Sequence, residues 1–323
     1  MTADRGKLVT IFGGSGFIGR HAVRALAKRG WRIRVAVRRP DLAGHVQPLG
    51  AVGQIMPVQA NLRYRWSVDR AVEGADAVVN LVGILSENGR QTFGAVQSFG
   101  ARAVAEAARG AGISTLVQMS ALGAAANSES LYARSKAEGE AAALQTVPGA
   151  VVLRPSIVFG PEDQFFNRFA NLTRFMPFLP LIGGGTTRLQ PVFVGDVAEA
   201  IARAVDGTVA GGRVYELGGP EVKTFRECLE LTLKEIERSR PLLPMPWGVA
   251  RVQASIMEWL PNPMMTRDQL KLLETDNVVS PQAIAEARTL QGMGITPTSL
   301  AAVLPSYLVR FKPHGQFNDK RVA

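Results

Sequence analysis

The sequence has almost no cysteine and little histidine. Cys228 is its single cysteine, and its three histidines, His21, His45 and His314, are scattered along the chain. One cysteine forms no intrachain disulfide and no cysteine cluster for zinc, and scattered histidines lack the spacing of a metal site. We therefore expect no metal ion and a reducing compartment.

Aromatic residues, acidic charge and long apolar runs are also in short supply. Aromatics make up 7% of the 323 residues, and 27 acidic residues stand against 37 basic ones, a formal net charge of +10. No stretch reaches the about 20 apolar residues that a membrane-spanning helix needs. No basic patch alternates with aromatics, which argues against nucleic acid as a partner. Arg20, Arg24 and Lys28 recur on one helical face, which favours an acidic protein surface or an anionic membrane face.

Residues 7–39 combine a strand, a glycine-rich turn, a helix and a second strand. Leu8–Phe12 has the length and branched residues of a buried parallel strand, and Gly13, Gly16 and Gly19 follow with GxxGxxG spacing. The first glycine permits a tight turn, the second lets the backbone approach a pyrophosphate, and the third lets the helix pack closely. Free N–H groups at the helix start face the anion. The segment predicts a dinucleotide-binding unit.

The end of the second strand indicates which dinucleotide binds. An NAD site of this kind expects an acidic side chain about 20 residues after the glycines, but no Asp or Glu occurs between Asp4 and Asp41. The strand Arg32–Val37 is followed by Arg38 and Arg39, and a guanidinium pairs with a 2′-phosphate through two parallel hydrogen bonds. The alternative is that both arginines are solvated ends of the strand. The pattern favours NADPH.

Strand and helix patterns alternate through the first half of the chain. Further strands are predicted at 53–59, 76–81, 115–120 and 150–154, and helices at 67–73, 96–109 and 131–145. With the first two strands they make an α/β fold, a doubly wound parallel Rossmann sheet of six strands. We expect an NADP(H)-binding Rossmann domain at 1–160, a smaller, interleaved C-terminal α+β region at 161–310, and a polar tail at 311–323.

Three residues form a catalytic pattern. Tyr132 and Lys136 are four residues apart, on one face of a predicted helix, and Ser120 ends the strand before it. A lysine ammonium beside a phenol lowers the pKa of the tyrosine, which can then act as acid or base toward a carbonyl or alcohol whose oxygen the serine holds. The alternative is that Lys136 only binds the ribose of the nicotinamide nucleotide, without turnover.

The chain resembles the extended short-chain dehydrogenase/reductase (NAD-dependent epimerase/dehydratase) superfamily over roughly residues 7–217. The resemblance rests on GGSGFIG at 13–19, NLVG at 80–83, Ser120, YARSK at 132–136, LRPSIVFGP at 153–161 and QPVFVGDVAEAI at 190–201. Nearly the whole chain is similar to an atypical family in it, the NADPH-binding accessory subunits of respiratory complex I. That likeness rests on QPLGAVGQI at 47–55, FGPEDQFFNRFA at 159–170 and MTRDQLKLLETDNVV at 265–279.

The resemblance implies a set of cofactor-binding residues. They are Gly13, Ser15, Gly16, Phe17, Ile18 and Gly19 around the phosphates, Arg38 at the 2′-phosphate, Asn61 and Leu62 near adenine, Val82 and Gly83 beside the ribose, and Ser120, Tyr132, Lys136 and Pro155 near the nicotinamide. Asn61 departs from the aspartate usual in the superfamily.

Two functions follow as expectations. The first is a complex I accessory subunit that holds NADPH tightly in a structural role. Its partners would be the other subunits near the quinone-binding region and an anionic membrane surface. It would lie on the cytoplasmic side of a bacterial inner membrane or the matrix side of a mitochondrial one. The alternative is a free NADP(H)-dependent oxidoreductase or epimerase acting on a sugar nucleotide, sterol or quinone precursor, with Arg168, Arg174 and Arg188 as candidate substrate-binding residues.

Residues 241–265 are candidates for docking. Trp247, Ala250, Ala254, Met257 and Leu260 form one apolar face of a predicted helix, and Val249, Val252, Ile256 and Trp259 form another. A helix apolar on two faces is either buried or docked on a partner groove or the membrane interface.

Overall fold

The computed structural model describes residues 6–259 and 265–313 of the chain, which forms two compact units. Unit 1 consists of Met1–Pro155, Gly195–Leu217 and Ser280–Thr296. Unit 2 consists of Ser156–Val194, Gly218–Val279 and Pro297–Ala323. The chain therefore leaves unit 1 and returns to it twice, so residues far apart in the sequence complete each unit.

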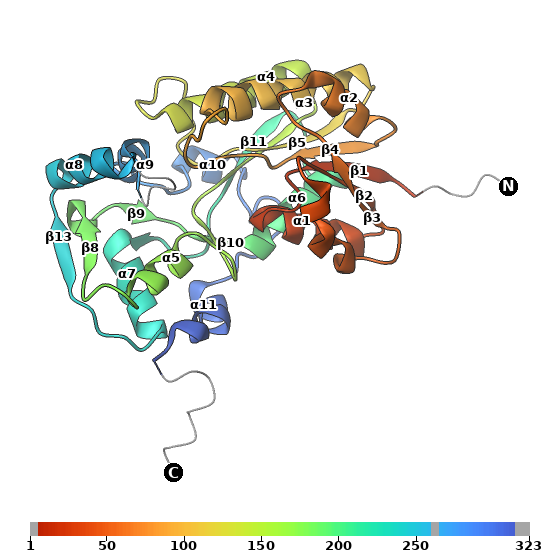
Figure 1. The fold of residues 1–323 in the computed structure, drawn as a ribbon. Helices are drawn as coiled ribbons and strands as arrows, with labels where there is room; N and C mark the ends of the chain where they lie inside the picture. Colours follow the sequence, from red (N-terminus) through yellow and green to blue (C-terminus); the bar gives the residue numbers. More distant parts are fainter. Residues whose placement is uncertain (1–5, 260–264, 314–323) are drawn as a thin grey trace, which may run out of the picture. The chain divides into compact units, whose positions relative to one another are not determined.

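Unit 1 is built on a seven-stranded parallel sheet with the order β11-β6-β5-β4-β1-β2-β3 (Figure 1). The strands are β1 (Leu8–Phe12), β2 (Arg32–Val37), β3 (Ile55–Gln59), β4 (Ala77–Asn80), β5 (Thr115–Met119), β6 (Val151–Pro155) and β11 (Arg213–Leu217). The predicted α/β class and doubly wound sheet are confirmed. The prediction of six strands was wrong by one, because β11 comes from the later part of the chain and pairs with β6 at the edge.

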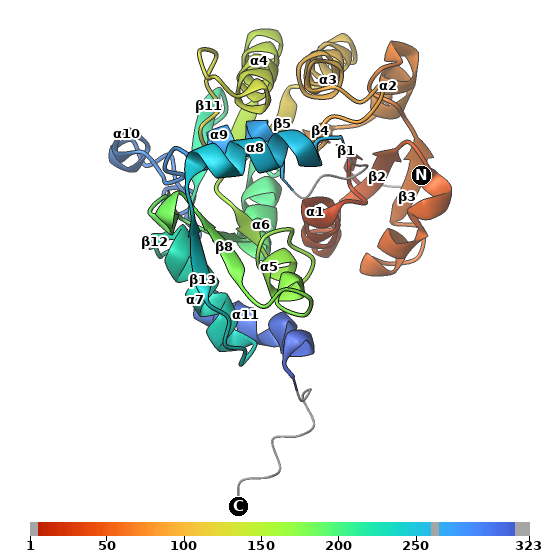
Figure 2. The ribbon, with the colours of Figure 1, turned by 60° about the vertical axis from the view of Figure 1, so that its left-hand side comes forward.

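Helices cover both faces of this sheet. α2 (Arg65–Val72), α3 (Phe99–Gly110) and α4 (Leu131–Thr146) lie on one face, and α1 (Phe17–Lys28) and α6 (Val194–Val205) lie on the other (Figure 2). The short helix α10 (Pro281–Ala285) also belongs to unit 1, although it lies late in the sequence. Ser130 is the N-cap residue of α4, and its hydroxyl accepts a hydrogen bond from the Ala133 N–H at 3.2 Å. This cap fixes the start of the helix.

Unit 2 contains three two-stranded sheets and five helices among its described residues. The strand pairs are β7 (Val158–Phe159) with β10 (Val192–Phe193), β8 (Leu179–Ile182) with β13 (Leu242–Met245), and β9 (Arg188–Leu189) with β12 (Lys223–Thr224). The helices are α5 (Phe166–Leu172), α7 (Phe225–Glu235), α8 (Trp247–Met257), α9 (Arg267–Leu273) and α11 (Leu300–Leu308). Its core combines leucines with phenylalanines, whose rings pack edge to face, as those of Phe169 and Phe225 do at 5.5 Å.

The start of the predicted polar tail needs correction. Phe311 is buried in the core of unit 2, and its carbonyl accepts a hydrogen bond from Arg238 Nε at 2.9 Å. Burial of an apolar ring stabilises the fold, so the packed structure extends at least to residue 311. The rest of the predicted tail, residues 314–323, lies outside the described residues.

The two apolar faces predicted for helix α8 differ in burial. Ala250 and Ala254 are buried, and Trp247 packs partly buried against the core of unit 2. The other face is exposed and consists of Val249, Val252, Ile256 and Trp259, called here the α8 stripe. Leu260 lies outside the described residues. Only one of the two faces is therefore available for docking.

Candidate functional site

The glycine-rich turn between β1 and α1 forms one wall of the site. Gly13 adopts φ +77°, a conformation that L side chains rarely adopt. A Cβ added to Gly19 would lie 2.3 Å from the Gly13 carbonyl oxygen, so only glycine permits this approach of helix and turn. A Cβ on Gly16 would meet nothing closer than 3.4 Å. No side chain of the described residues caps α1 at Gly16 with a hydrogen bond, which leaves the helix start open to an anion.

The loop after β4 lies directly against this turn. A Cβ added to Gly13 would lie 3.2 Å from a side-chain carbon of Val82 and 3.3 Å from its backbone nitrogen. The Leu81 N–H donates to the Phe12 carbonyl at 2.9 Å. β1 and β4 are neighbours in the sheet, so the structure brings the predicted phosphate and ribose segments together at one sheet edge.

The two arginines after β2 differ in their contacts. Arg39 forms an ion pair with Asp41 at 2.7 Å, and this carboxylate raises the pKa of Arg39 while its own pKa is lowered. Arg38 is exposed, and no ion pair or hydrogen bond of its side chain is found among residues 6–259 and 265–313. Arg38 is therefore the guanidinium that a ligand phosphate can engage without competition.

His45 also contacts the glycine-rich turn, which the sequence analysis missed. One ring nitrogen, Nε2, lies 3.2 Å from the Ser15 carbonyl oxygen, and Nδ1 lies 3.2 Å from that of Leu42. The ring ties the segment after β2 to the turn. Its position thirty residues after Ser15 carries no local pattern from which this contact could be predicted.

The predicted adenine-binding residues follow β3. The Asn61 side-chain oxygen accepts a hydrogen bond from the Arg63 N–H at 3.2 Å, which stabilises the turn. The Leu62 side chain is buried in the core and packs on Gly100. Only the backbone of Leu62 is thus left to face a ligand.

Ser120, Tyr132 and Lys136 gather where β5 ends and α4 begins. Lys136 is buried, and its Nζ donates to the Met119 carbonyl at 3.3 Å and lies 5.8 Å from the centroid of the Tyr132 ring. A Cβ added to Gly83 would lie 3.1 Å from Nζ, so the ribose-side loop and the lysine are adjacent. Burial lowers the pKa of Lys136 to about 8, against an opposing effect of Glu140.

Ser120 has a hydroxyl that lacks a partner. Its Oγ is buried and makes no hydrogen bond within the described part of the chain. Its backbone N–H donates to Leu153 at 2.7 Å, and the N–H of Leu122 donates to the Pro155 carbonyl at 3.0 Å, so β6 supports this loop. A buried hydroxyl without a partner costs free energy and is the kind of group that a ligand oxygen satisfies.

Gln97 is a second residue that the sequence analysis missed. It lies in a single π-helical turn, Gly94–Ser98, a feature found often at functional sites. Its Nε2 donates to the Ile84 carbonyl at 2.6 Å, and its Oε1 accepts from Ser135 Oγ at 2.9 Å. Gln97 therefore ties the ribose-side loop to the helix that carries Tyr132 and Lys136.

The arginines proposed for a substrate diphosphate are in unit 2. Arg188 is engaged by Asp276, with Nη2 at 2.7 Å from the carboxylate. The Arg174 guanidinium lies 5.9 Å from the Phe175 ring, and Arg168 is partly buried, which lowers its pKa. Arg188 is thus already paired with a carboxylate of its own unit.

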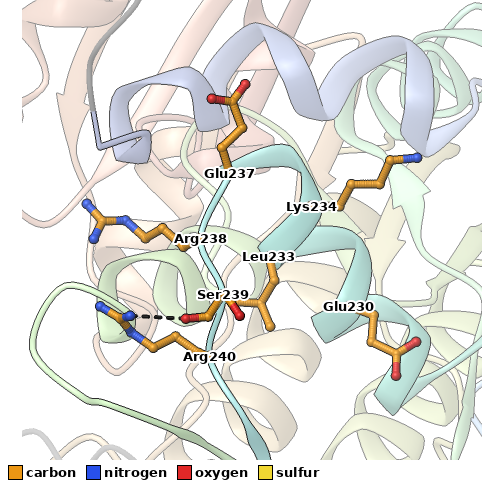
Figure 3. Close-up of a pocket in the computed structure, with 7 residues that line it drawn as sticks. All are labelled: Glu230, Leu233, Lys234, Glu237, Arg238, Ser239 and Arg240. Carbon is orange, nitrogen blue, oxygen red and sulfur yellow. Dashed lines mark hydrogen bonds between the residues drawn. The ribbon is translucent and has the colours of Figure 1, made fainter.

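A surface depression of about 490 Å³ lies at the end of α7 in unit 2 (Figure 3). Its arginines are already used: Arg238 donates to Phe311, and Arg240 donates to the carbonyls of Thr173 and Ser239. Glu237 is paired with Lys312 at 2.6 Å. The two arginines and Glu237 of the depression are thus engaged by other described residues of unit 2.

Known proteins resemble this chain in sequence and in fold. Residues 9–218 match the NAD dependent epimerase/dehydratase family. The chain is 34% identical to the mitochondrial NADH dehydrogenase (ubiquinone) 1 alpha subcomplex subunit 9 of Arabidopsis thaliana, over 96% of this chain and 79% of that protein. It is also 37% identical to a ceramide reductase of Caulobacter vibrioides over 61% of each chain.

Solved structures show the same fold at lower identity. A dTDP-glucose 4,6-dehydratase of Streptomyces venezuelae, crystallised with NAD bound, superposes with a TM-score of 0.69 at 20% identity. The match covers 94% of this chain and 96% of that one.

Proposed function

The chain belongs to the NAD dependent epimerase/dehydratase family, and we propose that it serves as an NADPH-binding accessory subunit of complex I, a membrane-bound NADH:quinone oxidoreductase. The likeness to the plant alpha subcomplex subunit, which extends over nearly the whole chain, carries this proposal. Family membership and a relative crystallised with NAD support a nicotinamide dinucleotide. The choice of the phosphorylated form rests on the exposed Arg38 and on the lack of an acidic residue before Asp41.

The residues present fit such a nucleotide. A Cβ at Gly16 would meet nothing closer than 3.4 Å, so the backbone there can approach a pyrophosphate. The Ser120 hydroxyl has no hydrogen-bond partner among the described residues and could bind an oxygen or amide near the nicotinamide. Bound NADPH would supply a hydride. The assigned contacts are Gly13, Ser15, Gly16, Phe17, Ile18 and Gly19 with the phosphates, Arg38 and more weakly Arg39 with the 2′-phosphate, Asn61 and Leu62 with adenine, Val82, Gly83 and Lys136 with ribose, and Ser120, Tyr132 and Pro155 with nicotinamide.

We infer a structural role for the nucleotide. Lys136 lies against Gly83, where its ammonium would bind the ribose hydroxyls. Such a contact holds the ligand without any step of turnover. A nucleotide that binds only the folded state stabilises it in proportion to the logarithm of its concentration over its Kd, which suits a subunit that must persist in a complex.

A free NADP(H)-dependent oxidoreductase is the second candidate. Ser120, with its partnerless hydroxyl, Tyr132 and Lys136 form a set that could hold a carbonyl oxygen and pass it a proton. The likeness to a ceramide reductase over part of the chain favours a lipid carbonyl or alcohol as substrate. The pairing of Arg188 with Asp276 weighs against a sugar nucleotide.

Attachment to the complex is assigned to the α8 stripe. The two arginines beside it are neutralised, Arg251 by Glu274 at 2.6 Å and Arg267 by Glu258 at 3.0 Å. The absence of free positive charge on these arginines favours an uncharged apolar surface of a partner subunit near the quinone-binding region over anionic lipid. The exposed Arg24 and Lys28 on unit 1 offer a contact to an anionic surface. No described helix is long and apolar enough to cross a membrane.

One purification tests the proposal. Native membranes are solubilised mildly and complexes are separated by size, and the subunit and its nucleotide are followed by mass spectrometry. We expect the chain with stoichiometric NADP(H) in the fraction that oxidises NADH with quinone. A chain found only as a free protein would reject the accessory role. Loss of an NADP(H)-dependent reaction in Tyr132→Phe, with assembly intact, would favour the oxidoreductase.

A further inference from the structure

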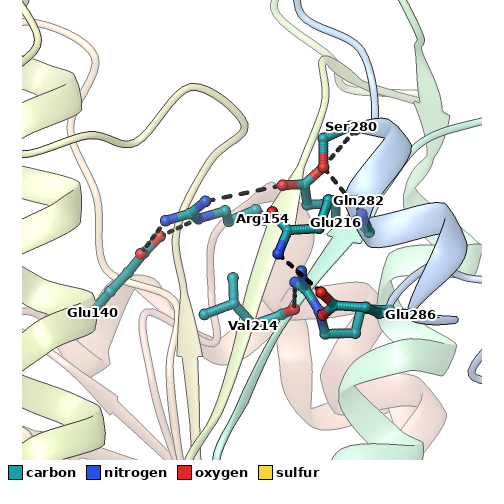
Figure 4. A network of polar contacts seen from close by, with 9 residues as sticks. Glu140, Arg154, Val214, Glu216, Ser280, Gln282 and Glu286 are labelled. Atoms are coloured by element: carbon teal, nitrogen blue, oxygen red, sulfur yellow. Dashed lines mark hydrogen bonds and ion pairs between the residues drawn. The ribbon is translucent and has the colours of Figure 1, made fainter.

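A network of charged side chains of alternating sign extends from α4, the helix that carries Lys136, to strands of the sheet (Figure 4). Glu140 is one helical turn after Lys136 on α4 and is buried. Arg154 on β6 donates to both oxygens of the Glu140 carboxylate, from Nε at 2.7 Å and from Nη2 at 2.6 Å. This bidentate geometry is the strongest form of the pair.

The network of charged side chains continues beyond Arg154. Its Nη1 lies 3.9 Å from an oxygen of Glu216 on β11, and the other Glu216 oxygen accepts the Ser280 N–H at 2.7 Å. Glu216 is also buried. The network thus joins all three sequence segments of unit 1.

The charges of this network balance only with the lysine included. Glu140 and Glu216 carry two negative charges and Arg154 one positive charge, so the three together are one unit negative. A buried net charge is costly unless a partner compensates it. Lys136 is a buried cation four residues before Glu140, a spacing that places the two side chains on one face of α4.

The immediate surroundings of Lys136 supply few other charges. α4 contributes the Tyr132 ring and Glu140, β5 contributes the Met119 carbonyl, and the loop after β4 contributes Gly83. Glu140 carries the charge that opposes the effect of burial on the pKa of the lysine.

We propose that Glu140, held in place by Arg154 and Glu216, is a positioning residue that keeps the buried Lys136 protonated and so able to bind the ribose of the nucleotide. The claim that Lys136 binds the ribose rests on the proposed function. The claim that Glu140 keeps Lys136 protonated concerns the free protein and does not rest on it. Burial lowers the pKa of Lys136 to about 8 and Glu140 opposes that effect, so its removal lowers the pKa further.

The experiment follows the proton of Lys136 directly. Lysine side chains labelled with ¹³C at Cε are titrated by NMR, and Lys136→Met assigns the signal. We expect Glu140→Gln to lower the pH of proton loss by about one unit, the usual effect of removing a nearby opposite charge. Glu138→Gln, on the exposed face of the same helix, is the matched control and should leave it unchanged. An unchanged titration in folded Glu140→Gln overturns the proposal.

A second variant covers the case in which Glu140→Gln does not fold. Glu216→Gln keeps the bidentate pair of Glu140 and Arg154 but removes one negative charge, so a smaller shift in the same direction is expected. No shift in this variant also contradicts the proposal. Its fold is checked by circular dichroism before the titration.

Nucleotide binding separates this inference from the proposed function. In the unchanged protein, affinity for NADPH should fall at alkaline pH as Lys136 loses its proton, and in Glu140→Gln this fall should begin at lower pH. A protein that binds no nucleotide at any pH rejects the proposed function alone. A protein that binds it with identical pH profiles in both forms rejects the role of Glu140.

Discussion

Gly19 lies so close to Gly13 that a single added carbon at Gly19 would stand 2.3 Å from the Gly13 carbonyl oxygen. This contact fixes the first turn of α1 against the turn that precedes it. A Cβ at Gly16, between them, would make only an ordinary contact with the Gly13 carbonyl oxygen at 3.4 Å. The two glycines of one motif therefore have separable tasks, one in packing and one in leaving room for a ligand.

This separation gives the first prediction. Gly19→Ala should destabilise the free protein by about 1 to 3 kcal/mol, because the backbone must shift to admit the methyl group. Gly16→Ala should leave stability nearly unchanged but weaken both NADPH and NADH, and Gly16→Val should abolish both. Thermal unfolding without nucleotide and titration with each nucleotide measure the two effects. Equal destabilisation by Gly16→Ala and Gly19→Ala would contradict the separation.

The second prediction concerns the two arginines after β2. Arg38→Ala should weaken NADPH by about 1.5 to 3 kcal/mol, the worth of a charge-assisted hydrogen bond, and should barely change NADH. Arg39→Ala should have a smaller effect, because Asp41 already engages that side chain. Calorimetric titration of both variants with both nucleotides provides the comparison. Tighter binding of NADH than NADPH to the unchanged protein would refute the assignment of the cofactor.

The third prediction is a pH dependence of stability. The pKa of Lys136 is about 8 in the folded protein and 10.5 for an ordinary lysine, so between these pH values the unfolded chain binds one more proton than the folded chain. Stability of the nucleotide-free protein should therefore rise with pH through this window, by roughly 3 kcal/mol from this one group. Lys136→Met should lack the rise. Denaturant unfolding of both proteins at pH 7.5, 9 and 10.5 tests it, and parallel curves would show that Lys136 does not titrate in this window.

The fourth prediction concerns docking through the α8 stripe. Replacing Ile256, 66% exposed, and Trp259, 91% exposed, by serine should release the protein from its complex while NADPH stays bound. Ile284→Ser is the matched control, because this isoleucine is 63% exposed on unit 1. Co-purification and bound nucleotide are measured together. Unchanged association in the double variant would exclude the stripe, and loss of attachment to lipid vesicles alone would indicate a membrane as its partner.

Trp247 is not a suitable probe of docking, although the sequence made it an equal candidate. A Cβ on Gly183 would lie 2.2 Å from its indole ring, so Trp247 packs closely within unit 2. Trp247→Ser should lower stability and thereby confuse loss of folding with loss of attachment.

Local patterns in the sequence were sufficient for the parts of this protein that depend on neighbours in the chain. The strand Leu8–Phe12, the glycine spacing that follows it and the four-residue separation of Tyr132 and Lys136 each report a backbone conformation set within one turn or strand. Strand periodicity and glycine conformation are short-range properties, so the parallel α/β fold could be predicted from them.

Only the tertiary structure decided what depends on residues far apart in sequence. The pairing of β11 with β6, the contact of His45 with Ser15 and the bonds from Gln97 to Ile84 and Ser135 join segments that no local pattern links. The same holds for burial, since two equally apolar faces of α8 differ only in what packs against them. Long-range packing also placed Arg154 on Glu140, the residue one helical turn after the buried Lys136.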